Sequence, residues 1–414
     1  MSSLQPVRGT HDLMFDDIRR HRLVQAKFAA LAAHYGYSEI TTPIFEATDV
    51  FARTLGDTTD IVTKEMYTFE TKGGESVTLR PEGTAGVARA FISEGLTQQT
   101  PLKFFYHGPM FRHERPQKGR QRQFHQIGAE LLGVPGPQGD VEVIALADHT
   151  LRELNLSGHI TLELNSLGDT ESRAAYRAVL IDFLFGHREK LSAESRERLE
   201  KNPLRVLDSK EPADKEIVVS APRFPDYLNQ TSRDFFKAVQ DGLNNLGIFF
   251  KLNSSLVRGL DYYSHTAFEF TTEALGAQGT VLAGGRYDGL IKQMGGPPTA
   301  GIGWAAGVER LAMLLSDLPP LPRPIAMIPV GESEDAIAQK LSHRLRNSGF
   351  NIDIGYSGNM GKRMKRANKL NARVALIIGE DEVKQSVVTV RQLDSGEQSR
   401  VAMADLESHL DQYR

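Results

Sequence analysis

The chain has 414 residues, of which 40% are hydrophobic and 24% charged, and 49 basic against 52 acidic side chains leave a formal net charge of −3. This composition excludes a disordered or fibrous chain, and the length predicts two or three domains. The charge excludes a globally basic nucleic-acid binder, although local basic patches stay possible. Because the chain has no cysteine, disulfides, zinc–thiolate sites, iron–sulfur clusters and thiol catalysis are excluded.

The sequence contains no apolar run near the roughly 18 residues of a transmembrane helix. The segment from Met1 to Asp12 also lacks the apolar stretch of a secretory signal. We therefore expect no membrane segment and a cytoplasmic location.

Apolar spacing predicts the elements of the N-terminal half in turn. We expect helices at residues 14–36, 83–95 and 141–154, and strands at residues 37–45, 59–80, 102–111, 122–133 and 160–164. Pro43 indicates that the first of these segments lies at a sheet edge or contains a bulge. The turn Lys72-Gly73-Gly74 divides residues 59–80 into two strands. The strands at 102–111 and 122–133 are predicted to form a long hairpin.

The C-terminal half changes character twice. Residues 169–245 are helical and heavily charged, which predicts an inserted helical module, and four prolines in Leu318–Pro324 predict a linker between domains 1–317 and 325–414. Between these segments we expect strands at 248–257, 261–272 and 279–284 and a helix at 304–316. Beyond the linker, strands at 325–330, 350–354 and 374–378 alternate with helices at 334–347 and 360–372, which predicts a small α/β domain with a parallel or mixed sheet.

The connection of the long hairpin is the first candidate for chemistry. Residues 103–126 contain one acid, Glu114, among many cations: Lys103, Arg112, Arg115, Lys118, Arg120 and Arg122. Arginine is suited to bidentate phosphate contacts, and the end of a strand would fix Arg112 in place. A solvated charged loop is the alternative interpretation.

Two further segments combine arginine with glycine. In Leu256–Tyr263, Arg258 stands between apolar residues and is costly to bury without an anion, which is either a ligand or Asp261. In Ala283–Gly289, the glycines permit close approach of the backbone to a ligand, and an ordinary glycine turn is the alternative.

Gly301–Ala306 has the letters of a dinucleotide-binding fingerprint, but neither a preceding strand nor a following strand with a ribose-binding acid is predicted. We expect instead a helix that opens at these glycines and carries Glu309 and Arg310 near its end. The sequence contains no GxxxxGK[ST], HExxH or GxSxG motif. With these motifs absent, the chemistry that the sequence indicates is the binding and positioning of anions by several arginines.

Together these segments resemble a class II aminoacyl-tRNA synthetase and, within that class, the histidyl-tRNA synthetase family. The resemblance covers nearly the whole chain and is carried by Arg8–Asp12, Thr42–Glu46 (motif 1), Leu79–Thr84, Phe111–Glu114 with Arg122–Gln126 (motif 2), Arg258–Tyr263, Gly284–Asp288 and Gly301–Arg310 (motif 3). Motifs 1 to 3 indicate only the class, whereas the pair Arg258–Tyr263 and Gly284–Asp288 is far more specific.

The resemblance implies an α+β catalytic domain at 1–317 with a six- or seven-stranded antiparallel sheet, a helical insertion at 169–245 and a C-terminal α/β anticodon-binding domain. It implies a homodimer with motif 1 at the interface. The expected activity joins L-histidine to ATP, with Mg²⁺, and then transfers the histidyl group to the 3′ end of tRNA(His). A non-catalytic, histidine-binding regulatory paralogue of ATP phosphoribosyltransferase is the less favoured alternative, because such paralogues typically lack the anticodon-binding domain.

The resemblance also implies roles for individual residues. Arg112, Arg258 and Arg310 are the expected catalytic residues and, with Glu114 near the adenine, bind ATP. Arg112 would hold the α-phosphate, Arg258 would bridge it to the substrate carboxylate, and Arg310 would meet the far end of the triphosphate. The expected histidine pocket consists of Glu82, Gly83, Thr84, Arg112, Gln126, Glu130, Arg258, Tyr262 and Tyr263. No side chain is assigned to a metal.

Within that pocket, Glu82, Thr84 and Gln126 would hold the ammonium group. Glu130 and Tyr263 would hydrogen-bond the imidazole, and a satisfied core acid is the alternative for Glu130. A buried polar pocket of this kind rejects analogues that lack the ring nitrogens by about 10⁴-fold or more, since its own groups would be left unpaired.

The predicted C-terminal domain carries a basic helix. Residues 354–379 contain no acid, and Met364, Ala367 and Leu370 are spaced to face a sheet, which predicts outward cations and an RNA-binding surface. A solvated helix face is the alternative. The expected tRNA contacts are Arg115, Gln117, Lys362, Arg363, Lys365 and Arg366.

Overall fold

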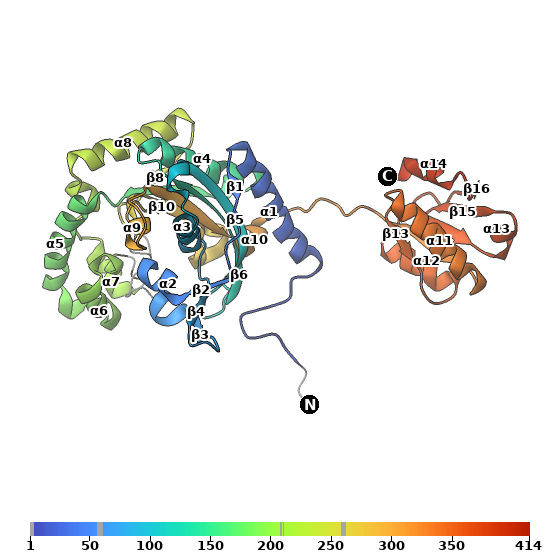
Figure 1. Cartoon of the computed structure of the whole chain (residues 1–414), viewed down its shortest axis with the longest axis horizontal. Helices are drawn as coiled ribbons and strands as arrows, with labels where there is room; N and C mark the ends of the chain where they lie inside the picture. Colours follow the sequence, from blue (N-terminus) through green and yellow to red (C-terminus); the bar gives the residue numbers. More distant parts are fainter. Residues whose placement is uncertain (1–3, 56–60, 208, 210, 258–261) are drawn as a thin grey trace. The chain divides into compact units, whose positions relative to one another are not determined.

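The strands of the protein form three sheets in a computed structural model that describes residues 4–55, 61–207, 209, 211–257 and 262–414. The chain divides into two units, Met1–Leu318 and Pro319–Arg414, and each is described by itself (Figure 1). No helix in the described ranges combines the length and apolar character needed to cross a membrane. The predicted segment Arg258–Asp261, and with it Arg258, lies outside the described residues.

An eight-stranded sheet organises the first unit. Its six central strands are antiparallel and follow one another in the order β5 (Leu102–Phe111), β6 (Gln123–Leu132), β11 (Gly301–Gly307), β10 (Thr280–Arg286), β9 (Ser264–Thr271) and β7 (Thr161–Ser166). Two short strands form the edges of the sheet: β1 (Ser38–Glu39) pairs in parallel with β5, and β8 (Lys251–Leu252) pairs in parallel with β7. The expected antiparallel sheet is therefore present, with two more strands at its borders.

The predicted helix at 304–316 is wrong in its first part. Gly301–Gly307 is strand β11, in the middle of the sheet, and the helix α10 extends only over Val308–Leu314. Glu309 and Arg310 thus lie in the first turn of that helix and not near its end. The prediction failed because β11 is covered on both faces, and a strand covered on both faces shows no polar alternation along the sequence.

Helices cover both faces of this sheet. The helices α1 (Phe15–His34), α4 (Pro137–Glu153), α8 (Gln230–Asn245) and α10 share one apolar core with one face. The helices α2 (Thr48–Leu55), α3 (Thr84–Ser93) and α9 (Leu290–Gln293) pack with the other face. Strand β6 shows the alternation: Ile127, Ala129 and Leu131 join the first core, and Gln126 and Glu130 point the opposite way.

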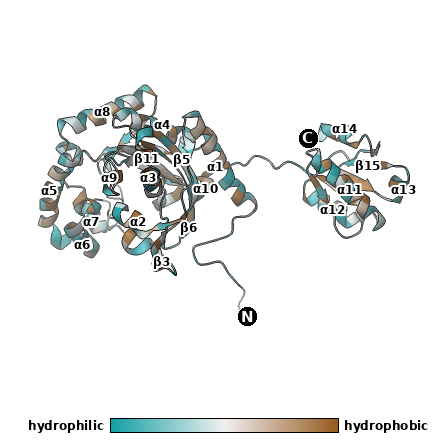
Figure 2. Cartoon of the chain, in the orientation of Figure 1, coloured by the Kyte–Doolittle hydropathy of each residue, from teal (hydrophilic) through white to brown (hydrophobic). Residues whose placement is uncertain are grey.

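The helical segment after β7 divides between two cores. The helices α5 (Thr170–Gly186), α6 (Ala193–Lys201) and α7 (Pro212–Val218) surround their own core, which includes Tyr176, Leu180 and Phe224, with the short helices η4 (Arg188–Lys190), η5 (Pro203–Val206) and η6 (Phe224–Tyr227) between them. In contrast, Phe236, Val239 and Leu243 of α8 belong to the core of the large sheet. The apolar and polar faces of these helices are visible in Figure 2. The helical character predicted for 169–245 is confirmed.

The smaller predicted strands are confirmed in part. The expected hairpin is formed by β3 (Tyr67–Glu70) and β4 (Ser76–Leu79), and β2 (Phe45–Ala47) completes a three-stranded sheet. The strand prediction is wrong for Ile61–Glu65, which is the helical turn η1. It is also wrong for most of 248–257, where only β8 is a strand. The remaining short helices are η2 (Leu96–Gln99), η3 (Ser157–His159) and η7 (Glu273–Gln278).

The second unit confirms the predicted mixed α/β domain. Its sheet has the order β13 (Ile352–Ile354), β12 (Ile325–Pro329), β14 (Val374–Ile378), β15 (Val387–Gln392) and β16 (Gln398–Ala402), parallel among the first three strands and antiparallel after them. The helices are α11 (Ser333–Asn347), α12 (Met360–Lys369), α13 (Glu380–Lys384), α14 (Leu406–Leu410) and η8 (Asp411–Tyr413).

Candidate active site

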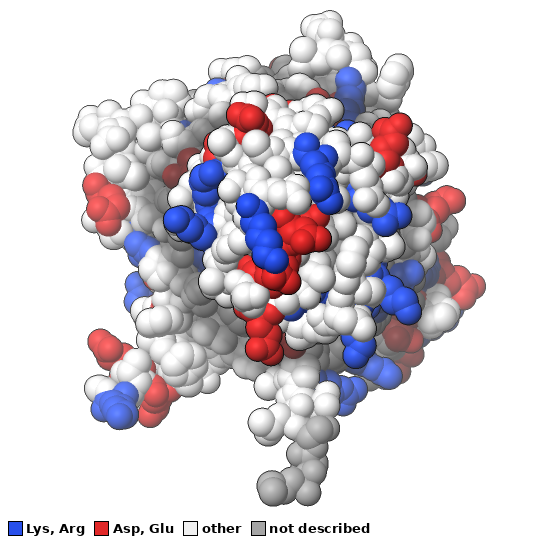
Figure 3. Space-filling model, turned by 90° about the vertical axis from the view of Figure 1, so that its right-hand side faces the viewer, with Lys and Arg blue, Asp and Glu red and all other residues white. Residues whose placement is uncertain are grey.

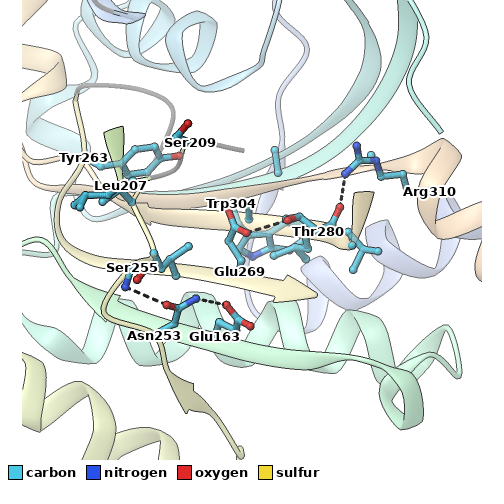
Figure 4. A pocket seen from close by; sticks show the side chains of 18 of the residues that line it. Glu163, Leu207, Ser209, Asn253, Ser255, Tyr263, Glu269, Thr280, Trp304 and Arg310 are labelled. Carbon is cyan, nitrogen blue, oxygen red and sulfur yellow. Dashed lines mark hydrogen bonds between the residues drawn. The ribbon is translucent and has the colours of Figure 1, made fainter. Parts of the chain in front are cut away.

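A cavity of about 990 Å³ opens beside the large sheet in the first unit. Figure 4 shows part of its wall, with Tyr263 toward one end of the view and Arg310 toward the other. Strands β7 and β9 contribute Glu163 and Glu269, which lie directly opposite each other in the register. Charged and polar side chains thus line the cavity together with apolar ones, whereas the core between the sheet and α1, α4 and α8 is apolar.

Glycines in β11 make room for large polar side chains. A Cβ atom on Gly303 would lie 1.7 Å from Oε2 of Glu130, and one on Gly301 would lie 2.2 Å from the ring of Tyr287. Both distances are far below van der Waals contact, so only glycine fits at either position. The glycines at 284 and 285 similarly permit close packing against Trp304 and Tyr263. In the described structure these glycines meet protein side chains, which explains their presence without a ligand.

Glu130 is the most buried acid of the site. It has no exposed surface, and its carboxylate accepts hydrogen bonds from Oγ1 of Thr84 at 2.6 Å and from the hydroxyl of Tyr287 at 2.5 Å. Burial raises the pKa of Glu130 to about 8, and the two hydrogen bonds oppose that rise. A carboxyl group poised near neutral pH can accept a proton from a partner or donate one to it.

Glu82 stands at the start of α3. Its carboxylate accepts hydrogen bonds from the backbone N–H groups of Thr84 at 2.6 Å and Ala85 at 2.7 Å, which are otherwise unpaired at a helix start. Burial raises the pKa of Glu82 although these hydrogen bonds favour its charged form. Nearby, Oε1 of Gln126 is buried without a hydrogen-bond partner among the described residues. These groups give the pocket acceptors for an ammonium group.

The arginines approach the cavity from the long hairpin and from α10. Arg112 donates from Nε to the carbonyl of Pro81 at 2.9 Å, and its guanidinium lies over the ring of Phe124. Arg310 donates to the carbonyl of Thr280. Burial lowers the pKa of Arg310, and Arg120 and Arg112 lower it further by repulsion. This concentration of positive charge is suited to an anion such as a polyphosphate.

The structure brings most of the expected residues to one place. Eight of the predicted site residues line the cavity: Glu82, Thr84, Arg112, Glu114, Gln126, Tyr262, Tyr263 and Arg310. Glu130 adjoins them through Thr84, and Gly83 packs against the ring of Tyr106. Arg115 and Gln117 are exposed on the hairpin loop.

Sequence reasoning missed Tyr287 as a residue of the site. It belongs to a segment that was singled out, Gly284–Asp288, but its role depends on Glu130, which lies far away in the sequence. Arg286, next to it, is fully buried and forms an ion pair with Asp140 of α4, so this arginine serves the opposite sheet face.

The basic helix α12 differs from the prediction. Arg363 does not point outward: it is only 8% exposed, donates to the carbonyl of Pro329 and pairs with Asp335. Leu370, predicted to face the sheet, is 37% exposed instead. The buried positions of α12 are 363 and 367, one helical turn apart, because the aliphatic stem of an arginine can be buried like an apolar side chain.

The remaining cations of α12 are at the surface. Lys362 and Lys365 are exposed, and Arg366 pairs with Asp353 at 3.0 Å. On the molecular face drawn in Figure 3, basic and acidic side chains are interspersed. That face presents single lysines and arginines and not one continuous basic field.

The large antiparallel sheet carries the motif 2 hairpin and the motif 3 strand and helix, and the same chain contains a separate mixed α/β unit. These features together define a class II aminoacyl-tRNA synthetase. The comparisons with known proteins then give the particular family. The family model "Histidyl-tRNA synthetase" matches residues 9–311, and the model "Anticodon binding domain" matches residues 325–413. The chain belongs to the histidyl-tRNA synthetase family.

Individual relatives match over nearly the full length. The chain is 62% identical to a protein of Rhodospirillum rubrum named histidine–tRNA ligase, over 99% of both chains. It is 55% identical to one of Gluconobacter oxydans with the same name, over 98% of both. Among solved structures, the apo histidyl-tRNA synthetase of S. aureus is similar, with a TM-score of 0.83, 33% identity and coverage of 98% of this chain and 99% of that one.

Proposed function

We propose that the chain is a histidine–tRNA ligase. In the first step the carboxylate of L-histidine attacks the α-phosphate of ATP, a P–O bond to the β-phosphate breaks, and pyrophosphate leaves. In the second step a terminal ribose hydroxyl of tRNA(His) attacks the carbonyl of the adenylate, loses its proton and releases AMP. The observation that carries this function is the buried Glu130 carboxyl, which contacts Thr84 at the wall of a cavity that Arg112 and Arg310 line.

The geometry supports a division of the cavity into two parts. In the proposed amino-acid pocket, Glu82, Thr84 and Gln126 hold the ammonium group of histidine. Glu130 and Tyr263 hydrogen-bond the imidazole, which leaves buried groups unpaired if another amino acid enters. Since Glu130 is held by Thr84 and Tyr287, its orientation is set before histidine arrives.

The phosphates occupy the other part in this proposal. Arg112 contacts the α-phosphate, where negative charge accumulates as the carboxylate attacks, and Arg310 contacts the far end of the triphosphate. Preorganised donors of this kind lower the barrier because they need no rearrangement at the moment of reaction. Arg258 is proposed to bridge the α-phosphate and the carboxylate, and Glu114 to lie near the adenine.

Mg²⁺ is expected with ATP, and the donor chemistry of the cavity fits it. Glu163 and Glu269 offer carboxylate oxygens from directly opposed positions, the ligand type that Mg²⁺ prefers. When bound, the ion would offset charge on the phosphates. The protein's own residues bind and orient the nucleotide and the amino acid.

The other parts of the proposal concern organisation. Residues 1–317 form the catalytic core with the insertion at 169–245, 318–324 the linker and 325–414 the anticodon-binding domain. Arg115 and Gln117 contact the acceptor end of the tRNA, and Lys362, Lys365 and Arg366 the anticodon region. A homodimer through motif 1 and a cytoplasmic location remain predictions. The regulatory alternative is not favoured, because the full-length relatives are named as ligases.

Charging of purified tRNA(His) with radiolabelled histidine tests the function. We expect the wild type to form histidyl-tRNA, and Arg112→Gln to lose about 10² to 10³ in rate, as for a removed transition-state donor. The matched variant Arg115→Gln should keep pyrophosphate exchange and lose only tRNA charging. A folded wild-type protein that binds histidine but never charges tRNA would instead favour the regulatory alternative.

A further inference from the structure

Three residues with metal-ligating side chains meet outside the proposed substrate contacts. His21 comes from α1, His125 from β6 and Glu309 from the first turn of α10, elements that are far apart in the sequence. Their potential ligand atoms all lie within 4.8 Å of one another. None of the three has a role in the binding of histidine, ATP or tRNA as proposed above.

Both carboxylate oxygens of Glu309 accept from the backbone N–H of His125, at 2.9 and 3.0 Å, whereas one nitrogen of His21 has no partner among the described residues. Nδ1 of His125 lies 2.9 Å from Oε1 of Glu309, and the two histidine rings meet edge to face. His21 is only 5% exposed, yet its Nδ1 is buried with no hydrogen-bond partner in the described part of the chain. A buried polar nitrogen without a partner needs an explanation, and an ion bound at the imidazole is one.

The donor set points to a class of ion. Two imidazoles and one carboxylate are the ligands found at three-ligand zinc sites, in which a water or another molecule completes the tetrahedron. Magnesium and calcium prefer all-oxygen sites, so this trio favours a transition metal. We propose that His21, His125 and Glu309 bind a divalent transition-metal ion of the Zn²⁺ type.

The site has a route from solvent and a structural consequence. The side chains of His125 and Glu309 remain 22% and 11% exposed, so an ion reaches them without unfolding. A bound ion would connect α1 to β6 and α10. Two of its ligands are sequence neighbours of proposed substrate residues: His125 precedes Gln126, and Glu309 precedes Arg310. Occupancy would therefore restrict the motion of these two residues without contact between the metal and the substrates.

Equilibrium dialysis of the chelator-treated, untagged protein against ZnCl₂ tests the proposal. The variants are His21→Gln and, as matched control, His159→Gln, which changes an exposed histidine. We expect one tight site per chain in the wild type and the control, and affinity lower by more than about 100-fold in His21→Gln, beyond the 10- to 100-fold typical of outer-shell changes. Equal Zn²⁺ affinity and stoichiometry in all three proteins would overturn the site.

Co²⁺ substitution provides a second measurement that needs no variant. A site with two imidazoles, a carboxylate and one water should give wild-type Co²⁺ protein the strong visible absorption of a four-coordinate ion. The weak spectrum of the hexaaqua ion would contradict the proposal, even if His21→Gln failed to fold. That result would mean that His21, His125 and Glu309 form a hydrogen-bonded cluster that binds no metal ion.

Discussion

Gly303 of β11 lies directly opposite Glu130 of β6, and a methyl group at Gly303 would lie 1.7 Å from the Glu130 carboxylate. The absence of a side chain at Gly303 therefore leaves the space that the buried carboxylate of Glu130 occupies. This relationship connects a feature of motif 3 to the proposed recognition of the imidazole, although the two residues are remote in sequence.

Gly303→Ala should displace Glu130 and weaken histidine binding. Overpacking costs about 1–3 kcal/mol, which corresponds to roughly 5- to 100-fold in affinity. We expect the KM for histidine to rise by that factor in pyrophosphate exchange, with the KM for ATP nearly unchanged. Gly186→Ala is the matched control, since a Cβ there meets nothing within 4 Å. Equal rises in both KM values would show that the sheet as a whole is disturbed.

Tyr287→Phe removes one of the two hydroxyl donors to Glu130. Because Glu130 keeps its proton near neutral pH, the bond joins two neutral groups, and such bonds contribute about 0.5–1.5 kcal/mol. The KM for histidine should therefore rise by roughly 2- to 10-fold. Tyr37→Phe is the control, because the hydroxyl of Tyr37 is also buried but has no partner among the described residues. If the two variants bind histidine equally well, Tyr287 does not orient Glu130.

The raised pKa of Glu130 predicts a pH dependence of stability. Between the ordinary pKa of 4.5 and about 8, the folded protein keeps a proton that the unfolded chain releases. Stability therefore falls as the pH rises through this range, by at most about 1.4 kcal/mol per pH unit, and Glu130→Gln should lose this component.

Fluorescence of Trp304, the only tryptophan, follows the unfolding of the first unit without interference from the second. The denaturant midpoint is measured at pH 5.5 and at pH 8. From the lower to the higher pH, it should fall further for the wild type than for Glu130→Gln. Parallel falls in the two proteins would mean that Glu130 is ionised throughout this range.

Lys362→Gln with Lys365→Gln should weaken tRNA binding without an effect on adenylate formation. Removal of a phosphate contact reduces the slope of log affinity against log salt by about 1. We expect a higher KM for tRNA and a smaller slope, while Lys384→Gln, whose lysine pairs with Glu380 at 2.6 Å, behaves as the wild type. An unchanged salt slope in the double variant would place the RNA contacts elsewhere.

The sequence predicts local elements of this fold better than relationships across the sheet. The hairpin β5–β6 has clear strands and a basic connection, and both are confirmed. The predicted helix over β11 is wrong because the glycines of this strand match a helix start and its two covered faces hide the alternation. On α12, Arg363 occupies an inward position that residue type alone assigns to the surface.

The site was predictable to the extent that its motifs are contiguous. Glu82, Thr84, Arg112 and Gln126 lie in short segments, and the structure brings them to one cavity. The partnership of Tyr287 with Glu130 depends on the register of β10, β11 and β6, which no local pattern specifies. The same is true of the His21, His125 and Glu309 trio, whose members come from three separate elements.

Amino-acid-dependent ATP–pyrophosphate exchange across all twenty amino acids tests the central claim most directly. We predict exchange with histidine alone, and its loss by about 10²-fold or more in Arg112→Gln. Exchange with a different amino acid would contradict the proposed pocket. A complete absence of exchange, in a folded protein that still binds histidine, would contradict the proposed ligase activity itself.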